Sequence, residues 1–257
     1  MTRDRTYALG AHTTESFARV ATGDRPLAVL VPVGAVEPHG PHLGLSTDIA
    51  ISQAVCDRAA PALDRAGVAA LVSPAVPFGV TDCARAFAGA ISVPADVVTA
   101  YLRAVIDGFL AQGASHVCLV NSHLEPAHDQ AVRAAAEGRG ARAGIASPLE
   151  RRYARTLSEE FRRGACHAGR YETSIALAAA PELVDDETAR ALPEVDVSLS
   201  DALAAGVRDF ADMGLSRAYA GAPARATTEE GVALLRKLAD MVVTQVREAL
   251  ERPPDRG

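Results

Sequence analysis

The sequence predicts an α/β fold in which a single domain holds a mainly parallel central sheet flanked by helices. Three continuous apolar runs rich in β-branched residues, at 27–33, 69–76 and 116–121, are typical of strands buried on both faces. The segments between them carry helical spacing, and strands that alternate with helices of this length indicate βαβ units. No linker-like tract or internal repeat divides the chain, so the sequence favours one domain over residues 1–257.

The expected helices follow the strands in order. The patterns at 49–66 and 94–112 are each closed by a glycine, Gly67 and Gly113. Further elements are expected as a helix at 127–137, a short strand at 144–147, a helix at 149–163 and a short buried helix at 172–180. Residues 193–223 show little periodicity and are expected to be irregular.

The chain closes with a helix whose start is marked by a capping box of Thr227 and Glu230. An apolar stripe then runs along one face as far as Leu250. The stretches 1–14 and 252–257 are expected to be frayed tails of the single domain.

Composition excludes several classes of function. The 26 Lys and Arg residues are outnumbered by 32 Asp and Glu residues and form no basic run, which argues against a nucleic-acid partner. The longest apolar stretch, 27–36, is too short to span a bilayer, and the start lacks the apolar core of a signal peptide. The four cysteines are far apart, as in reduced proteins. The sequence therefore predicts a cytoplasmic protein without a membrane partner.

Histidine and acidic residues follow the first predicted strand. Glu37 and His39 are separated by one residue, so both side chains point to the same side of an extended segment. Asp48 follows at the start of the next helix. Ligand sites of parallel sheets lie at the carboxyl ends of the strands, where this segment begins. A polar loop that happens to contain a histidine and an acid is the alternative interpretation.

The third predicted strand ends in the same way, with His123 and Glu125 two residues apart. Together the two strand ends offer two imidazoles and three carboxylates, a set suited to zinc, manganese or another borderline divalent ion. Five ligands suffice for two metals if one carboxylate bridges them. Two such metals can hold a shared hydroxide and polarise a carbonyl, which is the chemistry of metal-assisted hydrolysis.

A third cluster contains His167 and Glu172, five residues apart across a glycine turn into a helix. They could converge on the site as a proton shuttle and a supporting acid. The alternative is a loop histidine followed by an acid favoured by the helix dipole. His116 and His128 are expected at the surface or at helix termini.

These motifs together resemble the creatininase (creatinine amidohydrolase) family. The resemblance is carried by Pro32-Val-Gly-Ala-Val-Glu37-Pro-His39-Gly-Pro-His42-Leu with Thr47-Asp48, by Asn121-x-His123-x-Glu125, and by His167-Ala-Gly-x-x-Glu172-Thr-Ser. It implies an α/β fold with two divalent metals, usually including zinc, and cleavage of unusual amide C–N bonds. It also implies a homo-oligomer, since several members are hexamers.

Carried over by position, the resemblance implies that Glu37 and His123 hold one metal and that His39 and Glu125 hold the other. Asp48 would bridge the two ions. His167 would be the proton shuttle that serves the leaving nitrogen, and Glu172 would support the site. The implied cofactors are two divalent ions, zinc paired with zinc, manganese or iron.

The departures from the family pattern concern the substrate pocket, where Thr81, Leu124 and Cys166 are the expected substrate-binding residues. Leu124 stands where the family has a tyrosine beside the metals, and Thr81 replaces a serine in a family loop. The chain has no tryptophan, whereas creatininase encloses its flat ring with tryptophans. The resemblance therefore implies a member other than creatininase itself.

The sequence thus predicts a metal-dependent amidohydrolase that cleaves a non-peptide or cyclic amide C–N bond of a small molecule through a metal-bridging hydroxide. The expected partner is an amide or lactam substrate. A formamide deformylase or a peptide-end hydrolase on the same metals is the alternative within enzymes. A non-catalytic subunit that binds metal or a small molecule is the alternative of another class.

Overall fold

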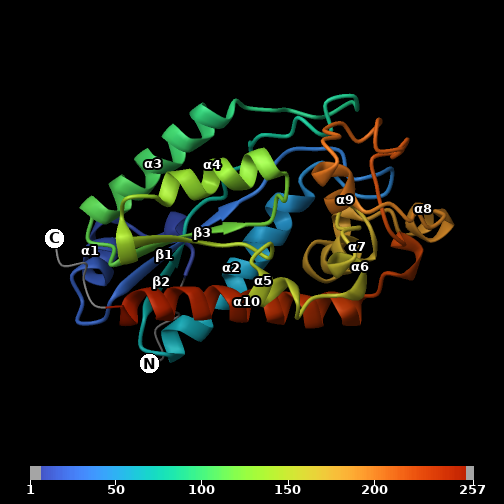
Figure 1. Cartoon of the computed structure of the whole chain (residues 1–257). Helices are drawn as coiled ribbons and strands as arrows, with labels where there is room; N and C mark the ends of the chain where they lie inside the picture. The colour runs from blue at the N-terminus through green and yellow to red at the C-terminus, as the bar shows by residue number, and fades with distance from the viewer. Residues whose placement is uncertain (1–6, 253–257) are drawn as a thin grey trace.

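The computed structural model describes residues 7–252 and places a four-stranded parallel sheet at the centre of the chain (Figure 1). The strands are β1 (Leu27–Val33), β2 (Ala69–Val72), β3 (His116–Asn121) and β4 (Ala143–Ala146), in the order β2-β1-β3-β4. Every residue of β1 and β3 is buried, which explains why these strands are continuous apolar runs in the sequence. The predicted α/β fold with a mainly parallel sheet is confirmed.

Successive residues of β1 point to opposite faces and enter two different cores. Ala28 and Leu30 belong to the cluster that includes residues of α2 (Thr47–Arg65), α7 (Arg170–Ala179) and α10 (Thr228–Glu251). Leu27, Val29 and Val31 belong to the cluster formed with α3 (Ala95–Ala111) and α4 (Pro126–Ala136). Figure 1 shows α3 and α4 on one side of the sheet and α2 and α10 on the other. The sheet is therefore covered on both faces.

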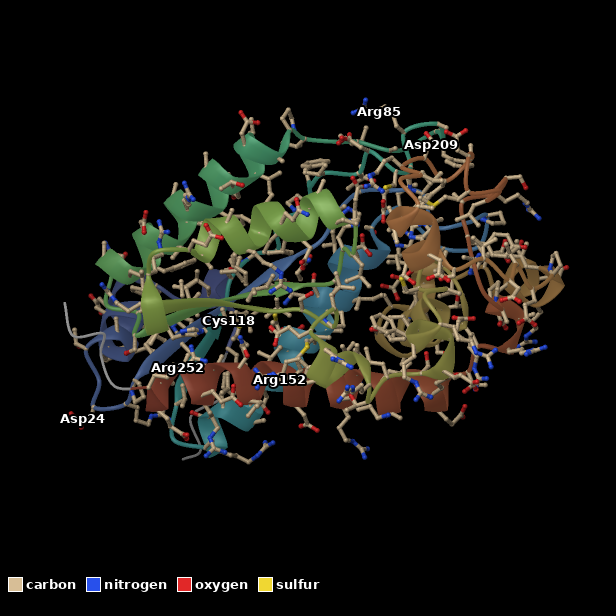
Figure 2. The ribbon with its side chains drawn as sticks, in the orientation of Figure 1. Asp24, Arg85, Cys118, Arg152, Asp209 and Arg252 are labelled. Carbon is tan, nitrogen blue, oxygen red and sulfur yellow. The ribbon has the colours of Figure 1, made fainter. Side chains whose placement is uncertain are left out.

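Apolar side chains lie between these layers, and most charged side chains lie on the outside. Cys118 on β3 is fully buried beside α2 and α10, whereas charged residues such as Asp24 and Arg85 project at the periphery (Figure 2). Arg152 lies against α10, with its Nη1 atom 2.8 Å from Oε1 of Glu248 (Figure 2). The four cysteines are free thiols, in agreement with the prediction from their spacing.

The shorter elements gather around the carboxyl ends of the strands and at the periphery. They are η1 (Leu9–Ala11), α1 (Thr14–Ala21), η2 (Gly140–Arg142), α5 (Arg151–Ala154), α6 (Glu159–Arg162), η3 (Pro181–Leu183), α8 (Asp186–Ala191), α9 (Leu199–Ala204) and η4 (Pro223–Arg225). Of the frayed tails predicted at 1–14 and 252–257, residues 1–6 and 253–257 lie outside the described residues. The prediction is wrong for the rest of the first tail, because 9–11 form η1 and Thr13 caps α1, which begins at Thr14. In the part of the chain that is described, no helix has the length and hydropathy needed to cross a membrane.

The single helix predicted at 149–163 is wrong, because two short helices occupy this stretch. Thr156 donates its hydroxyl to the carbonyl oxygen of Tyr153 at 2.8 Å, at the end of the first turn. Ser158 then accepts the backbone N–H of Phe161 at 3.2 Å and starts α6 as its N-cap. Hydroxyl side chains that bond the local backbone compete with helix continuation, which accounts for the break.

Helix α10 packs closely against α7 at Gly231. A Cβ atom added at Gly231 would lie 1.8 Å from the carbonyl oxygen of Ser174 on α7. We expect Gly231→Ala to lower the free energy of unfolding by about 2–3 kcal/mol, because the two helices would have to separate. Urea denaturation followed by circular dichroism measures this change.

The matched control is Gly108→Ala on α3, where an added Cβ meets nothing within 4 Å. Alanine favours a helix over glycine, so this variant should gain about 0.5–1 kcal/mol. Equal stability of the two variants would contradict the packing argument.

Candidate metal centre

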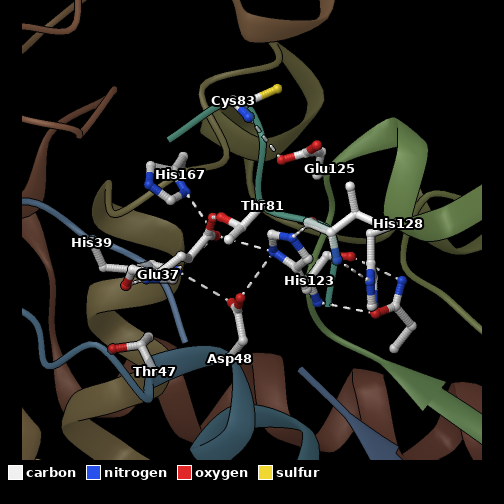
Figure 3. A network of polar contacts seen from close by, with 12 residues as sticks. Glu37, His39, Thr47, Asp48, Thr81, Cys83, His123, Glu125, His128 and His167 are labelled. Atoms are coloured by element: carbon white, nitrogen blue, oxygen red, sulfur yellow. Dashed lines mark hydrogen bonds and ion pairs between the residues drawn. The ribbon is translucent and has the colours of Figure 1, made fainter. Parts of the chain in front are cut away.

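A buried cluster of carboxylates and imidazoles lies at the carboxyl ends of β1 and β3 (Figure 3). Glu37 and His39 leave the end of β1, and His123 leaves the end of β3. Asp48 is the second residue of α2 and Glu172 lies in the first turn of α7. Because β1 pairs with β3 from Ala28 and His116 to Val33 and Asn121, the two strand ends are neighbours. Each of the five side chains is at most 3% exposed.

His123 is fixed in orientation by a backbone carbonyl. Its Nε2–H donates to the carbonyl oxygen of Val80 at 2.6 Å, and a carbonyl oxygen can only accept. The Nδ1 atom is thereby directed at the carboxylates and lies 3.0 Å from Oε1 of Glu37 and 3.0 Å from Oδ2 of Asp48. Asn121 holds the backbone of His123 from both sides, through its Oδ1 and Nδ2 atoms.

His39 is held with the other ring nitrogen, Nε2, facing the cluster. Its Nδ1–H donates to the carbonyl oxygen of Glu37 at 3.1 Å. The Nε2 atom therefore points into the cluster, 3.2 Å from Oδ1 of Asp48 and 3.6 Å from Oε2 of Glu172. Nε2 of His39 and Oδ2 of Asp48 are buried, and within the described residues neither makes a hydrogen bond of good geometry, although each lies at ion-pair distance from a neighbour in the cluster. Buried polar atoms are rarely left in this state, so the pair fits a bound cation.

Three groups of side chains bring their ligand atoms within 4.8 Å of one another. One group contains Glu37, Asp48 and His123, and another contains His39, Asp48 and Glu172. The third group is Glu37, His39 and His167. The first two groups share Asp48, as two adjacent metals with a bridging carboxylate require. Mixed imidazole and carboxylate sets of three suit zinc and similar divalent ions.

The charges of the cluster depend on one another. Burial alone would raise the pKa of Glu37, but the neighbouring His123 lowers it to about 2. Burial alone would lower the pKa of His39, but the carboxylate of Asp48, assisted by Glu172, raises it to about 10. Protons on the two imidazoles thus neutralise the carboxylates when no metal is bound. A divalent cation would replace these protons.

Glu172 reaches the cluster from a strained turn. Its Oε2 atom accepts the backbone N–H of Ala168 at 2.6 Å, and Ala168 has a φ of 52° in the left-handed region. The next residue, Gly169, admits no side chain, since a Cβ there would lie 2.3 Å from the carbonyl oxygen of Ala220. Burial raises the pKa of Glu172 to about 8, against the attraction of His39. Glu172 thus lies within the buried cluster, with Oε2 3.6 Å from Nε2 of His39.

His167 lies at the edge of the cluster. Its Nε2–H donates to the carbonyl oxygen of Pro38 at 2.9 Å, and its Nδ1 atom lies 3.7 Å from Oε1 of Glu37. The ring centroid is 4.5 Å from that of His39 and 4.5 Å from that of Phe210. Burial, together with the charge of His39, lowers the pKa of His167 to about 4. The ring is therefore neutral near pH 7, with an acceptor atom turned toward the cluster.

Glu125 lies apart from the three groups, beside Cys83 (Figure 3). Its two carboxylate oxygens accept the backbone N–H groups of Asp82 at 3.1 Å and Cys83 at 3.0 Å. The structure thus brings Glu172 to His39 and Asp48, where the sequence analysis expected Glu125. A metal-ligand role for Glu125 stays a prediction.

The expected substrate-binding residues lie in two different places. Thr81 is fully buried and donates its hydroxyl to Oε2 of Glu37 at 2.5 Å, so it supports a ligand of the cluster. Leu124 and Cys166 line a cavity of about 370 Å³ that opens onto the cluster. Burial raises the pKa of the Cys166 thiol to about 12, which leaves it protonated. Cys166 therefore serves as part of the wall.

His128 is a residue of the site that the sequence analysis did not identify. It lies in the first turn of α4, but its ring is fully buried, 4.7 Å from the ring of His123. Its Nδ1 atom accepts the backbone N–H of Val80 at 3.3 Å, while the carbonyl of Val80 holds His123. Gly79 leaves room for the ring, since a Cβ there would lie 2.4 Å from Nδ1 of His128. The peptide unit of Val80 thus links the two histidines.

Known proteins resemble this chain over part or most of its length. A protein from Mycobacterium ulcerans described as a mycofactocin precursor peptide peptidase is 28% identical over 235 residues, covering 85% of this chain and 84% of that protein. A creatinine amidohydrolase from Pseudomonas putida is 34% identical over 116 residues, which is 43% of this chain and 42% of that protein.

Solved structures share the fold. A mutant creatininase of the Zn–Zn type superposes with a TM-score of 0.72 at 23% identity and covers 96% of this chain and 100% of that one. The manganese form of creatininase gives a TM-score of 0.67 at 25% identity over 96% of this chain and 100% of its own. The family model described as creatinine amidohydrolase matches residues 11–246. The chain therefore belongs to the creatininase family.

Proposed function

We propose that this protein is a metal-dependent hydrolase that cleaves a non-peptide or cyclic amide C–N bond of a small molecule. The observation that carries the proposal is the pair of buried ligand groups that share Asp48 at the base of a cavity. Membership of the creatininase family supports it. Ligands clustered at this depth are costly to bury without a cation, because their charges leave water.

Glu37, Asp48 and His123 would hold one ion, and His39, Asp48 and Glu172 would hold the second. Nε2 of His39 and Oδ2 of Asp48, which lack a hydrogen bond of good geometry, fit such a pair of ions. We propose zinc paired with zinc, manganese or iron, because imidazole and carboxylate ligands suit these metals. The bound ions would supply Lewis-acid polarisation of the amide carbonyl and a lowered pKa for water.

His167 is placed to move the proton that the reaction requires. Its Nε2–H is held by the carbonyl of Pro38, so Nδ1 is the atom that accepts a proton from the attacking water. The same atom can return this proton to the departing nitrogen. Because its pKa is lowered to about 4, the ring starts neutral and releases the proton readily. Phe210 packs against the ring and limits the access of bulk water.

Hydrolysis of a peptide end is the second candidate, since the mycobacterial relative described as a precursor peptide peptidase matches 85% of this chain. A formamide deformylase would use the same metals.

The homo-oligomeric assembly and the cytoplasmic location inferred from the sequence are part of the proposal. A protein that loads metal and cleaves none of these amides would be the non-catalytic binding subunit.

Metal content distinguishes the possible ligand sets. By elemental mass spectrometry we expect about two ions per chain in the wild type, about one or none in His123→Ala and about one in Glu172→Gln. Glu125→Gln should keep both ions, because its carboxylate is bound to backbone N–H groups of Asp82 and Cys83. Loss of an ion in Glu125→Gln together with retention in Glu172→Gln would reverse the assignment.

The catalytic role of His167 is tested with the metals in place. Zinc-loaded His167→Asn should keep its metal and lose about 10²–10⁴-fold in kcat, since the departing nitrogen has no proton donor. The assay follows amine, formate or amino-acid release from lactams, formamides and short peptides. Unchanged turnover in a variant that retains its metal would exclude His167 as the proton shuttle.

His128 should tune metal binding through Val80. His128→Phe keeps a ring but removes the acceptor of the Val80 N–H, which loosens the carbonyl that orients His123. We expect zinc affinity, measured by competition with a chromophoric chelator, to fall about tenfold. His116→Phe is the matched control, because His116 is equally buried but bonds the carbonyl of Ala141 near the start of β3. An equal effect of both variants would refute the positioning role.

A further inference from the structure

The cavity in front of the metal cluster has an apolar wall that comes from the segment at 193–223. Leu199 and Leu203 on α9 and Phe210 beyond it line the cavity and belong to one apolar cluster. Leu124 and Leu149 add further apolar surface. A cavity of about 370 Å³ with such a lining binds a small ligand mainly by burying its apolar surface.

This wall lies on one particular side of the reacting bond. Phe210 packs on the ring of His167 at 4.5 Å, and His167 faces the departing nitrogen in the proposed mechanism. With the departing nitrogen at His167, its substituent would extend toward Phe210 and toward Leu199 and Leu203, which line the same cavity. The acyl side of the bond would then lie toward Glu37 and Asp48, which also line the cavity.

Apart from histidines, the charged side chains that line the cavity are all acidic. Glu125 and Asp129 line the cavity, and within residues 7–252 neither lysine nor arginine does so. Arg133, the nearest cation to Asp129, is already paired with it, with Nε 2.6 Å from Oδ2. Apart from the proposed ions, which the amide carbonyl would occupy, a substrate carboxylate would meet no positively charged side chain in this lining, and its desolvation would be costly.

We propose that the substrate is an amide or lactam whose nitrogen carries a neutral apolar group, such as a branched alkyl or aryl group. This inference rests on the proposed hydrolase function and on the role of His167 in it. One water adds to the carbonyl, the C–N bond breaks, and a proton from the water passes to the nitrogen. An open-chain amide gives a carboxylate and a separate amine, and a lactam gives both groups on one molecule, so no further reactant is needed. Amides of amino acids that keep a free carboxylate beside the nitrogen are poor substrates by the same reasoning.

Three formamides that share one acyl group test this inference. N-isopentylformamide carries the apolar group, N-methylformamide lacks it, and N-formylleucine carries the same branched chain with an added carboxylate. With zinc-loaded protein, we expect kcat/KM for N-isopentylformamide to exceed each of the others at least about tenfold. Calorimetric titration into metal-free protein, where no turnover occurs, should give the same order of affinities.

Two variants of the wall should change this order. Leu203→Ser should lower the ratio of kcat/KM for N-isopentylformamide to kcat/KM for N-methylformamide. Leu203→Arg should raise kcat/KM for N-formylleucine relative to N-isopentylformamide, because a guanidinium would pair with the carboxylate. Val232→Ser on α10, an exposed apolar position outside the cavity lining, is the control and should leave the order unchanged.

The outcomes separate this inference from the function on which it rests. Equal or better cleavage and binding of N-formylleucine or N-methylformamide would overturn the inference. If zinc-loaded protein cleaves no probe but binds N-isopentylformamide best, the apolar nitrogen-side pocket stands and hydrolysis of such amides is excluded. If neither turnover nor affinity depends on the substituent, the wall does not select the substrate.

Discussion

The carboxylate of Asp48 lies between two imidazoles, and the arrangement of the site depends on this contact. One oxygen is 3.2 Å from Nε2 of His39 and the other is 3.0 Å from Nδ1 of His123. Burial would raise the pKa of Asp48, but the two histidines hold it well below its usual range. The parallel pairing of β1 with β3 makes the contact possible, because it sets the two strand ends side by side at the start of α2. The sheet thus sets the distance between the cluster residues, and their buried negative charges favour a bound cation.

Around this contact, the backbone decides which nitrogen of each histidine faces inward. Carbonyl oxygens take the outer N–H of His39, His123 and His167, so that the remaining ring nitrogen is free for a metal or a proton. Two of these carbonyls come from residues that are distant in sequence from the histidine they hold. Pro38 is 129 residues from His167, and Val80 is 43 residues from His123. A few loops packed over the sheet therefore determine the chemistry, while the core of the fold determines where those loops begin.

The sequence could predict the sheet and most residues of the buried cluster for a physical reason. Buried parallel strands are apolar throughout, and polar residues directly after them must lie at the carboxyl edge. It places Glu125 beside His39, where the structure has Glu172, because the position of Glu125 depends on backbone N–H groups of Asp82 and Cys83, which are distant in sequence. Likewise, no local pattern marks the packing of His128 against His123. The apolar wall was also out of reach, because residues 193–223 are expected from the sequence to be irregular, whereas Leu199 and Leu203 lie on α9, whose six residues are too few to give a helical pattern.

The most direct test of the account is anomalous diffraction at the zinc absorption edge from crystals of the zinc-loaded protein. The account predicts two peaks about 3.5–4 Å apart. One peak would be ligated by Glu37, Asp48 and His123, and the other by His39, Asp48 and Glu172. A single peak, or a second peak ligated by Glu125 in place of Glu172, would contradict the shared-carboxylate centre described here.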